Sequence, residues 1–310
     1  MKTVILLATY NGQEYLSQQL DSVFAQSSQD FDLFIHDDGS SDGTMDIIRH
    51  YQDSYGDRIK LLPGPIFHSA KLSFMWMLKE VEADYYFFCD QDDVWHKDKV
   101  KNSLEILNAR DGAKPLAVFC DMEVVDEDLN LIDSSFINYL GRSPENLSYT
   151  QIIIDNPASG TSMGFNRALR DIAIGGQDID FDKVPMHDAW LLEIAAIYGQ
   201  IAFINSPMVK YRQTGHNLMG ASTESDSEKI ARNIDIVKSG SFLHKKREFV
   251  NESRRFAKEL IKLPDMPLGK AAVLREFANI GDRNKFYRLG FYKKYGFNRA
   301  KHTLWFYLWV

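Results

Sequence analysis

Hydrophobic and polar positions follow two alternating periods over the first 120 residues. Short runs of mainly apolar residues predict buried strands, and the stretches between them space apolar residues three and four apart, as one face of a helix does. The expected strands lie at 3–9, 31–37, 58–63, 84–90 and 116–121, and the expected helices at 14–26, 44–55, 72–81 and 97–110. Because the strands are apolar throughout, we expect a sheet covered by helices on both faces. The pattern predicts a doubly wound α/β fold.

After residue 121 the pattern is less regular. We expect a strand, turn and strand over 122–133, a small-residue strand running into a helix over 158–169, a helix over 186–199, and a pair of strands or turns over 200–214. The polar, Gly- and Ser-rich stretch at 220–229 indicates a mobile loop or lid, and basic amphipathic helices follow from residue 228. The chain is therefore expected to comprise a first domain over 1–227 and a basic, aromatic helical extension over 228–310.

Polar and acidic side chains directly follow three of the expected strands. They are Thr9, Tyr10 and Asn11 after the first strand, Asp37 and Asp38 after the second, and Asp90, Gln91, Asp92 and Asp93 after the fourth. In open α/β sheets, ligands bind beyond the carboxyl ends of the strands, so we expect these side chains to meet at one edge. Crowded carboxylates repel one another unless a cation offsets their charge.

The Asp-x-Asp pair at Asp90 and Asp92 indicates what that cation is for. Such a pair alone is more often a surface loop than a metal site, but here it follows a buried strand and shares an edge with a second acidic cluster. Carboxylates cannot bind phosphates directly, whereas Mg²⁺ or Mn²⁺ bridges the two through oxygen ligands. The sequence therefore predicts a divalent ion at Asp90 and Asp92, with a nucleoside diphosphate held against it.

Composition narrows the class of protein. The 310 residues are 45% apolar and 25% charged, as in ordinary soluble globular proteins. Residues 241–310 contain 16 Lys and Arg against 6 Asp and Glu, whereas residues 1–240 contain 20 against 37, so a basic tail follows an acidic body. The two cysteines, Cys89 and Cys120, are too few for a disulfide framework and indicate a reducing cytosol. No run reaches the ~18 apolar residues of a membrane span.

Four motifs together carry a family resemblance. "ATYNG", "DDGSSDGT", "CDQDDVW" and "HDAW" occur in the order and approximate spacing of family 2 glycosyltransferases, and the last two resemble the bacterial rhamnosyltransferase branch. The resemblance covers roughly residues 2–220. It implies the GT-A fold, a Rossmann-like nucleotide-diphospho-sugar transferase domain with a mixed sheet, over 1–227. No G-x-x-x-x-G-K-[ST] or G-x-G-x-x-G motif points to a P-loop or dinucleotide-binding protein instead.

The resemblance also implies a reaction. It predicts an inverting transfer of L-rhamnose from dTDP-β-L-rhamnose to a sugar acceptor of a lipid-linked cell-surface polysaccharide, which forms an α-L-rhamnosyl linkage. A family 2 enzyme that uses another nucleotide sugar, such as a UDP-hexose, is the alternative. A nucleotidyltransferase or a non-catalytic nucleotide-sugar binder is a lesser one, and the former would normally show a basic, Gly-rich loop where this chain has "ATYNGQEYL".

Site residues follow from the same motifs. Asp188 is the expected catalytic base, because an attacking acceptor hydroxyl must lose its proton; its alternative role is an acidic residue in the first turn of a helix. The resemblance places the donor nucleotide near Thr9, Tyr10, Asn11, Asp37, Asp38, Lys71, Asp90 and Gln91, and the metal near Asp90, Asp92 and His216. It places the acceptor or the diphosphate near Trp95, Gly160, Thr161, His187, Trp190 and Arg212. His216 is included because Thr214 stands where the branch usually has a histidine.

The C-terminal stretch at 286–310 interleaves Lys and Arg with Phe, Tyr and Trp. One interpretation is an interfacial helix with aromatic side chains at the lipid headgroups and cations facing anionic lipid. The other is a helix that docks on the body or on a second subunit of a homodimer. The acidic body disfavours a nucleic-acid surface. We therefore expect a cytoplasmic protein held peripherally on the inner face of the cell membrane.

Overall fold

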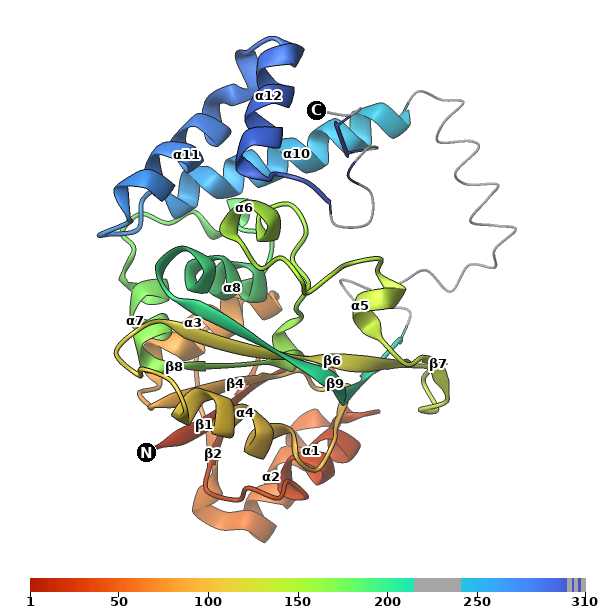
Figure 1. Cartoon of the computed structure of the whole chain (residues 1–310). Helices are drawn as coiled ribbons and strands as arrows, with labels where there is room; N and C mark the ends of the chain where they lie inside the picture. The colour runs from red at the N-terminus through yellow and green to blue at the C-terminus, as the bar shows by residue number, and fades with distance from the viewer. Residues whose placement is uncertain (215–240, 300–302, 304–305, 308–310) are drawn as a thin grey trace.

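A nine-stranded mixed sheet organises the chain (Figure 1). The computed structural model describes residues 1–214, 241–299, 303, 306 and 307. The strand order is β3-β2-β1-β4-β8-β6-β9-β5, and β7 pairs with β6. The strands are β1 (Thr3–Thr9), β2 (Asp32–Asp37), β3 (Ile59–Leu61), β4 (Tyr85–Cys89), β5 (Val94–Trp95), β6 (Leu116–Val125), β7 (Leu131–Asp133), β8 (Met163–Asn166) and β9 (Gln200–Arg212).

The connectivity of the sheet creates a binding edge. Strand β1 is parallel to both β2 and β4, and the chain runs outward through β2 and β3 before it returns to β4 on the other side of β1. The carboxyl ends of β1 and β4 therefore lie side by side at the point where the strand order reverses, which is where open α/β sheets bind ligands. Beyond β4 the sheet is mixed, since β8 is antiparallel to β4 and to β6, and β6 is parallel to β9.

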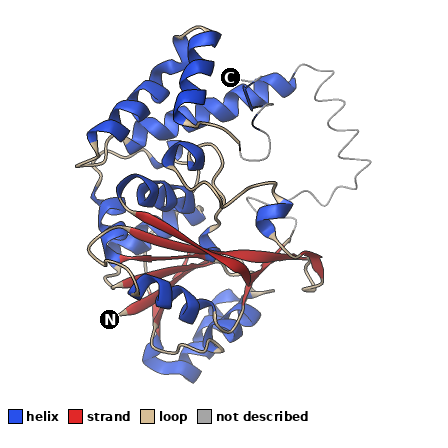
Figure 2. Cartoon of the chain, in the orientation of Figure 1, coloured by secondary structure: helices blue, strands red, loops and turns tan. Residues whose placement is uncertain are grey.

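Helices cover both faces of the sheet, as Figure 2 shows. Successive side chains of β1 point to opposite faces: Ile5 and Leu7 pack with α1, α2 and α4, whereas Val4 and Leu6 pack with α3, α7, α8 and the C-terminal helices. The helices are α1 (Leu16–Phe24), α2 (Thr44–Tyr55), α3 (Ala70–Glu80), α4 (Lys99–Asn108), α5 (Phe136–Tyr139), α6 (Tyr149–Ile152), α7 (Arg167–Gly175), α8 (His187–Tyr198), α10 (Ser241–Leu260), α11 (Leu268–Asn279) and α12 (Lys285–Tyr295). The expected α/β fold with a mixed sheet and a helical extension is confirmed.

The C-terminal helices pack on the face that carries α8. The rings of Trp190 in α8 and Phe256 in α10 lie 6.2 Å apart, and Leu274 of α11 belongs to the same hydrophobic cluster. The expected boundary near residue 227, like the loop expected at 220–229, falls outside the described residues, so the two-unit division stays a prediction. Within the described part of the chain, no helix combines the length and the apolar character needed to cross a bilayer.

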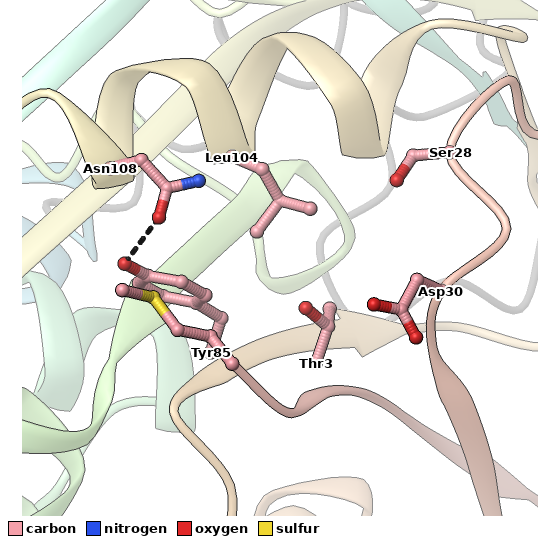
Figure 3. A pocket seen from close by; sticks show the side chains of 7 residues that line it. Thr3, Ser28, Asp30, Tyr85, Leu104 and Asn108 are labelled. Atoms are coloured by element: carbon pink, nitrogen blue, oxygen red, sulfur yellow. Dashed lines mark hydrogen bonds between the residues drawn. The ribbon is translucent and has the colours of Figure 1, made fainter.

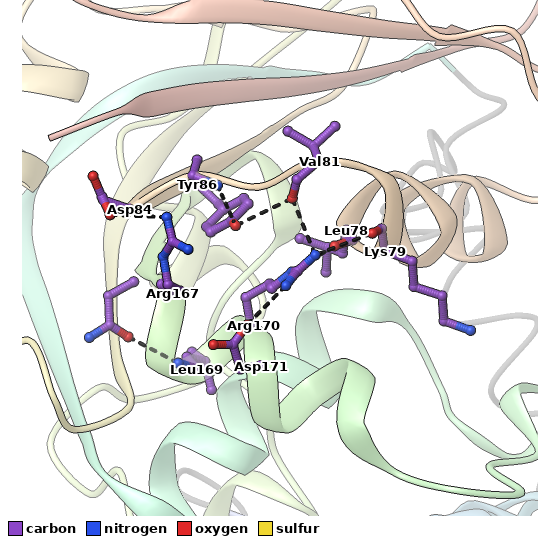
Figure 4. Close-up of polar contacts among 11 residues, drawn as sticks. Leu78, Lys79, Val81, Asp84, Tyr86, Arg167, Leu169, Arg170 and Asp171 are labelled. Atoms are coloured by element: carbon purple, nitrogen blue, oxygen red, sulfur yellow. Dashed lines mark hydrogen bonds and ion pairs between the residues drawn. The ribbon is translucent and has the colours of Figure 1, made fainter.

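Polar contacts fix α3, which later contributes to the site (Figure 4). The guanidinium of Arg170 in α7 donates to the carbonyl oxygens of Leu78 (2.8 Å), Lys79 (3.2 Å) and Val81 (3.4 Å). Carbonyl oxygens at the end of a helix have no hydrogen-bond partner inside it, and here the buried guanidinium of Arg170 supplies the missing donors. Arg170 therefore ties α7 to the end of α3.

The segment at 200–214 differs from the expectation of two strands or turns. It forms the single strand β9, whose pairing with β6 shifts register twice, around Asp121. Pro207 aligns with Asp121 at this irregularity, where a missing N–H disrupts a regular ladder least. The residues that were expected to form a pair of strands or turns thus form one irregular strand.

Candidate active site

A cleft of about 1210 Å³ lies along the carboxyl ends of β1 and β4. Most of the predicted donor-site residues line it, together with Gly160, His187 and Asp188. A smaller cavity of about 290 Å³ (Figure 3) includes Thr3 and Tyr85, the first residues of β1 and β4, so it opens at the other edge of the sheet. The sheet's binding edge and the acidic residues therefore belong to the larger cleft.

The acidic pair after β2 holds loops in place. The carboxylate of Asp37 accepts the hydroxyl of Thr9 (2.9 Å) and the backbone N–H of Ser40 (2.9 Å), and Asp37 does not line the cleft. Asp38 does line it, but its two oxygens accept the backbone N–H groups of Phe67 and Ser69. Asp37 is therefore placed behind the predicted nucleotide site, and Asp38 shapes it by anchoring the loop before α3.

That loop presents a histidine that the sequence analysis did not single out. His68 lies between the two residues bound by Asp38, has a φ of 50°, and lines the cleft. Its ring meets the edge of Tyr10 with centroids 5.7 Å apart, and Tyr10 is 48% exposed. A positive φ is uncommon outside glycine, so the conformation depends on the Asp38 hydrogen bonds. Sequence spacing gave no signal for this pairing.

Gln91 joins the ends of β1 and β4. Its side-chain oxygen accepts the backbone N–H of Tyr10 (2.8 Å), and its side-chain nitrogen donates to the Tyr10 carbonyl (3.0 Å). A methyl group on Gly12 would come within 2.5 Å of that side-chain oxygen, so glycine permits the close approach. The predicted donor-site residues Tyr10, Asn11 and Gln91 therefore form one connected rim.

The carboxylates after β4 occupy two depths. Asp90 and Asp92 line the cleft, whereas Asp93 is fully buried beneath it and accepts the backbone N–H of Arg212 (3.1 Å). Burial, together with the neighbouring charges of Asp92 and Asp188, raises the pKa of Asp90 to about 7. Burial also raises the pKa of Asp92, and the positive charge of Arg212 opposes that shift. Burial and like charges both disfavour the ionised form of a carboxyl group.

The start of α8 brings a third carboxylate to the cleft. Asp188 lies in the first turn, 7% exposed, and accepts the backbone N–H groups of Ala189 (2.5 Å) and Gly160. Burial raises the pKa of Asp188 to about 6, and the positive charge of Arg142 opposes that shift. Asp188 is thus poised to titrate near neutral pH, which suits a general base. Asp188 also lies where an acidic residue favours the helix dipole, and its hydrogen bond from Gly160 ties the start of α8 to a second segment.

Several predicted residues lie behind the cleft. Arg212 is 1% exposed, and its guanidinium donates to the carbonyl of Asp92 (2.7 Å), the side chain of Gln18 (2.6 Å) and the carbonyl of Glu127. Trp190 is fully buried and donates its indole N–H to the Ala173 carbonyl (3.0 Å). Arg212 thus supports the acidic turn and Trp190 packs in the core, and contact of either residue with the acceptor or the diphosphate stays a prediction.

Trp95, Thr161 and Lys71 also differ from their predicted roles. Trp95 donates its indole N–H to the Thr161 hydroxyl (3.2 Å), and both side chains are buried outside the cleft lining. Lys71 lines the cleft, but its ammonium donates to the carbonyls of Phe181 and Val184 (2.8 Å). Lys71 thereby holds η3 (Phe181–Lys183) and the approach to α8, a positioning task that the sequence did not reveal.

The acidic pair fits a divalent ion. Asp90 and Asp92 offer the hard oxygen ligands that Mg²⁺ and Mn²⁺ prefer, and both line the cleft. Among the described residues no group of three His, Cys, Asp or Glu side chains is placed to hold a metal. His216, the predicted third ligand, lies outside the described residues. The cleft also gathers Glu14, Tyr15 and Glu127, which the sequence analysis missed because they follow no strand-end motif.

The mixed sheet, the cleft at its switch point and the carboxylates that line it define a glycosyltransferase of the GT-A fold. A family model described as "Glycosyl transferase family 2" matches residues 4–172, more than half of the chain. The chain therefore belongs to glycosyl transferase family 2.

Relatives and solved structures agree with this assignment. The chain is 30% identical over 236 residues to a protein from Shigella flexneri named dTDP-rhamnosyl transferase RfbG, covering 70% of this chain and 74% of that one. Two solved structures share the fold, each with a TM-score of 0.56. The first is TarS residues 1–349 of S. aureus in complex with UDP-GlcNAc, which is 16% identical and covers 90% of this chain and 71% of that one. The second is the mannosyltransferase PcManGT of Pyrobaculum calidifontis in complex with GDP-Man and Mn²⁺, which is 15% identical and covers 92% of this chain and 71% of that one.

Proposed function

We propose that this glycosyltransferase is an inverting rhamnosyltransferase. It moves L-rhamnose from dTDP-β-L-rhamnose to a sugar acceptor of a lipid-linked cell-surface polysaccharide and forms an α-L-rhamnosyl linkage. The observation that carries the proposal is the presence, within one cleft, of the Asp90–Asp92 turn and of Asp188 from the start of α8. A single displacement at the anomeric carbon needs a leaving-group site and a base, and we assign the first to the Asp90–Asp92 turn and the second to Asp188.

Each side of the cleft has a defined task in this mechanism. Asp188 accepts the proton of the attacking acceptor hydroxyl, held in place by the N–H groups of Gly160 and Ala189. Asp90 and Asp92 would hold Mn²⁺ or Mg²⁺, which when bound stabilises negative charge on the departing diphosphate. Tyr10 and Asp38 lie at the β1–β2 end of the cleft, where the nucleoside would bind.

The choice of donor is supported by the relative named a dTDP-rhamnosyl transferase. A different nucleotide sugar is the main alternative, because solved structures of the same fold hold UDP-GlcNAc and GDP-Man. The lesser alternatives are a nucleotidyltransferase and a non-catalytic nucleotide-sugar binder. The position of Asp188 in the cleft, hydrogen-bonded from a second segment, favours a transferase over both.

A thermal-shift panel tests the donor and the ion. Each of dTDP, UDP and GDP is added with Mn²⁺ or Mg²⁺, and again with a chelator. A ligand that binds only the folded state raises the melting temperature. We expect the largest shift with dTDP and a divalent ion, and loss of that shift with chelator. A larger shift with UDP would show that the donor is a uridine nucleotide sugar. A shift that is unaffected by chelator would show that nucleotide binding needs no divalent ion.

The acceptor and the location belong to the same proposal. A lipid-linked acceptor requires contact with a membrane, and the C-terminal extension offers Phe286, which is 87% exposed beside Lys285 at the start of α12. We propose a cytoplasmic enzyme bound peripherally to the inner face of the membrane, and keep a homodimer contact as the alternative use of this surface. Flotation of the full chain and of its Phe286→Ser variant with anionic liposomes, at low and high salt, tests this. Equal behaviour of the two proteins would contradict a membrane role for Phe286.

A further inference from the structure

The side chain of Gln91 joins the ends of β1 and β4 beyond the last backbone pair of the two strands. The ladder between these strands ends at the pair Leu7–Cys89. Tyr10 lies past that pair, and the Gln91 amide accepts its N–H (2.8 Å) and donates to its carbonyl oxygen (3.0 Å). The amide thus satisfies both backbone groups of Tyr10, as a neighbouring strand would.

The turn after β1 is shaped to receive this link. A methyl group on Gly12 would come within 2.5 Å of Oε1 and 2.8 Å of Cδ of Gln91. Because φ at Gly12 is not positive, the close approach of the amide accounts for the glycine better than backbone conformation does. Asn11 ties the same turn to the loop after β2, since its N–H donates to the Ser40 hydroxyl (2.8 Å) and its side-chain oxygen accepts the N–H of Ser41 (2.9 Å). The turn is therefore held from both neighbouring strands.

The two segments that Gln91 joins have different tasks in the proposed function. Tyr10 is 48% exposed and lies at the end of the cleft assigned to the nucleoside. Asp90 and Asp92 flank Gln91 in the chain, line the same cleft and are assigned to the divalent ion. A nucleoside diphosphate bound through that ion spans both segments, so their relative position determines whether both contacts form at once.

We propose that Gln91 is a positioning residue that holds the nucleoside end of the cleft in register with the Asp90–Asp92 turn. This inference rests on the proposed function, which assigns the two ends. The role differs from the direct nucleotide contact that the family resemblance implies, because Tyr10 engages the amide oxygen and an N–H of Gln91. Segments that are held in place before a ligand arrives need not be ordered on binding. Losing the link should therefore weaken a ligand that contacts both segments, and spare a ligand that contacts one.

Three affinities test this role. Calorimetry measures dTDP with Mn²⁺, which contacts both segments, and dTDP with a chelator, which contacts the nucleoside end; electron paramagnetic resonance of free Mn²⁺ measures the ion alone. Gln91→Met keeps the length of the side chain and removes both hydrogen bonds. We expect it to bind dTDP with Mn²⁺ about 5- to 30-fold more weakly, the cost of ordering one or two mobile groups. The other two affinities should stay within about two-fold of those of the natural chain.

A second variant breaks the same link without changing the glutamine. Gly12→Ala places a methyl group against the Gln91 amide, which is the far end of a flexible side chain and can move aside. It should produce the same selective loss as Gln91→Met. The double variant should lose no more than about two-fold beyond either single variant, because both changes act on one link.

Gln26 provides the matched control. Its Nε2 donates to the His96 carbonyl oxygen (2.9 Å) and its Oε1 accepts the Val100 N–H (3.1 Å), so it also bridges backbone groups of a distant segment. It is 2% exposed and does not line the cleft. Gln26→Met makes the same chemical change and should lower Tm while leaving all three affinities in their natural ratio. A loss of stability is thereby distinguished from a loss of position.

The outcomes separate the inference from the proposed function. Equal weakening of all three affinities in Gln91→Met would show that Gln91 supports the whole site, and the inference would be wrong. Unchanged affinity for dTDP with Mn²⁺ in both Gln91→Met and Gly12→Ala would show that the link has no role in binding, and the inference would also be wrong. If the natural chain binds dTDP no more tightly with Mn²⁺ than with chelator, the proposed pairing of nucleotide and ion fails before any variant is compared, and the inference falls with it.

Discussion

Replacing Gly160 with alanine tests the junction on which Asp188 depends. Gly160 begins η2 (Gly160–Ser162), donates its N–H to Asp188, and packs against His187. A methyl group there would lie 2.4 Å from Nε2, 3.2 Å from Cε1 and 3.4 Å from Cδ2 of His187. Ordinary contacts begin near 3.4 Å, so the ring or the loop must move by about 1 Å. Because φ at Gly160 is not positive, the backbone itself accepts alanine.

The cost follows from what surrounds the ring. Phe74 and Phe88 leave His187 little room to move, so the clash resembles overpacking, which costs about 1–3 kcal/mol. For a chain of this size that lowers Tm by roughly 2–5 °C. A shift of about 1 Å in the N–H that orients Asp188 is expected to lower kcat by about 10².

The assay pairs thermal unfolding with donor turnover. Gly112→Ala is the matched control, because a methyl group there meets nothing within 4 Å, and it should change neither quantity. The double variant Gly160→Ala/His187→Ala removes the obstructing ring. It should melt higher than the sum of the two single effects predicts, with a coupling of about 1–2 kcal/mol. Natural Tm and turnover in Gly160→Ala would refute the close contact and with it the positioning of Asp188.

Three further predictions address the base, the buried histidine and the acidic turn. Asp188→Asn should retain dTDP binding and lower turnover by about 10² or more, and unchanged turnover would show that Asp188 is not the base. In the natural chain, kcat/KM should fall as pH drops below about 6, where Asp188 becomes protonated. His187 has its pKa lowered to about 3 by burial, against about 6.5 when unfolded. The unfolded state therefore binds a proton that the folded state does not, and stability is lost as pH falls below about 6.5. Urea unfolding at pH 7 and pH 5 should show a smaller loss for His187→Phe, and an equal loss would contradict the neutral ring. Arg212→Met should destabilise the fold by about 1–3 kcal/mol for each buried acceptor left unmet, because the guanidinium donates to the carbonyl oxygens of Asp92 and Glu127 and to the side chain of Gln18; a loss confined to diphosphate affinity, with unchanged Tm, would instead support Arg212 as a phosphate ligand.

Local sequence was informative wherever a pattern repeats over short distances. Apolar runs and helical spacing located the strands and helices of the first 120 residues, because burial on both faces of the sheet requires those periods. The strand-end rule then placed Tyr10, Asp38, Asp90 and Asp92 at one edge, and the structure brings them into one cleft. The family motifs added Asp188, which lines the same cleft. Each of these inferences needs only neighbouring residues and the general geometry of open sheets.

Sequence could not show which polar side chains already have partners from distant segments. Arg212 suited a phosphate by its chemistry, but the fold surrounds it with the carbonyls of Asp92 and Glu127 and the side chain of Gln18. Lys71 suited a nucleotide, but η3 brings two carbonyls to its ammonium from more than a hundred residues away. Only assembled contacts decide whether a polar side chain is already occupied.

By itself the sequence determined the class of this protein: an acidic, α/β chain with carboxylates at the ends of two parallel strands and a further carboxylate starting a later helix. Tertiary structure alone decided which of the polar groups remain available to a ligand. Asp37 and Arg212 are engaged by loops and turns, whereas Asp90, Asp92 and Asp188 line the cleft. The physical reason is that periodicity follows from local backbone geometry, while the pairing of a buried polar group depends on which distant segment the fold places against it.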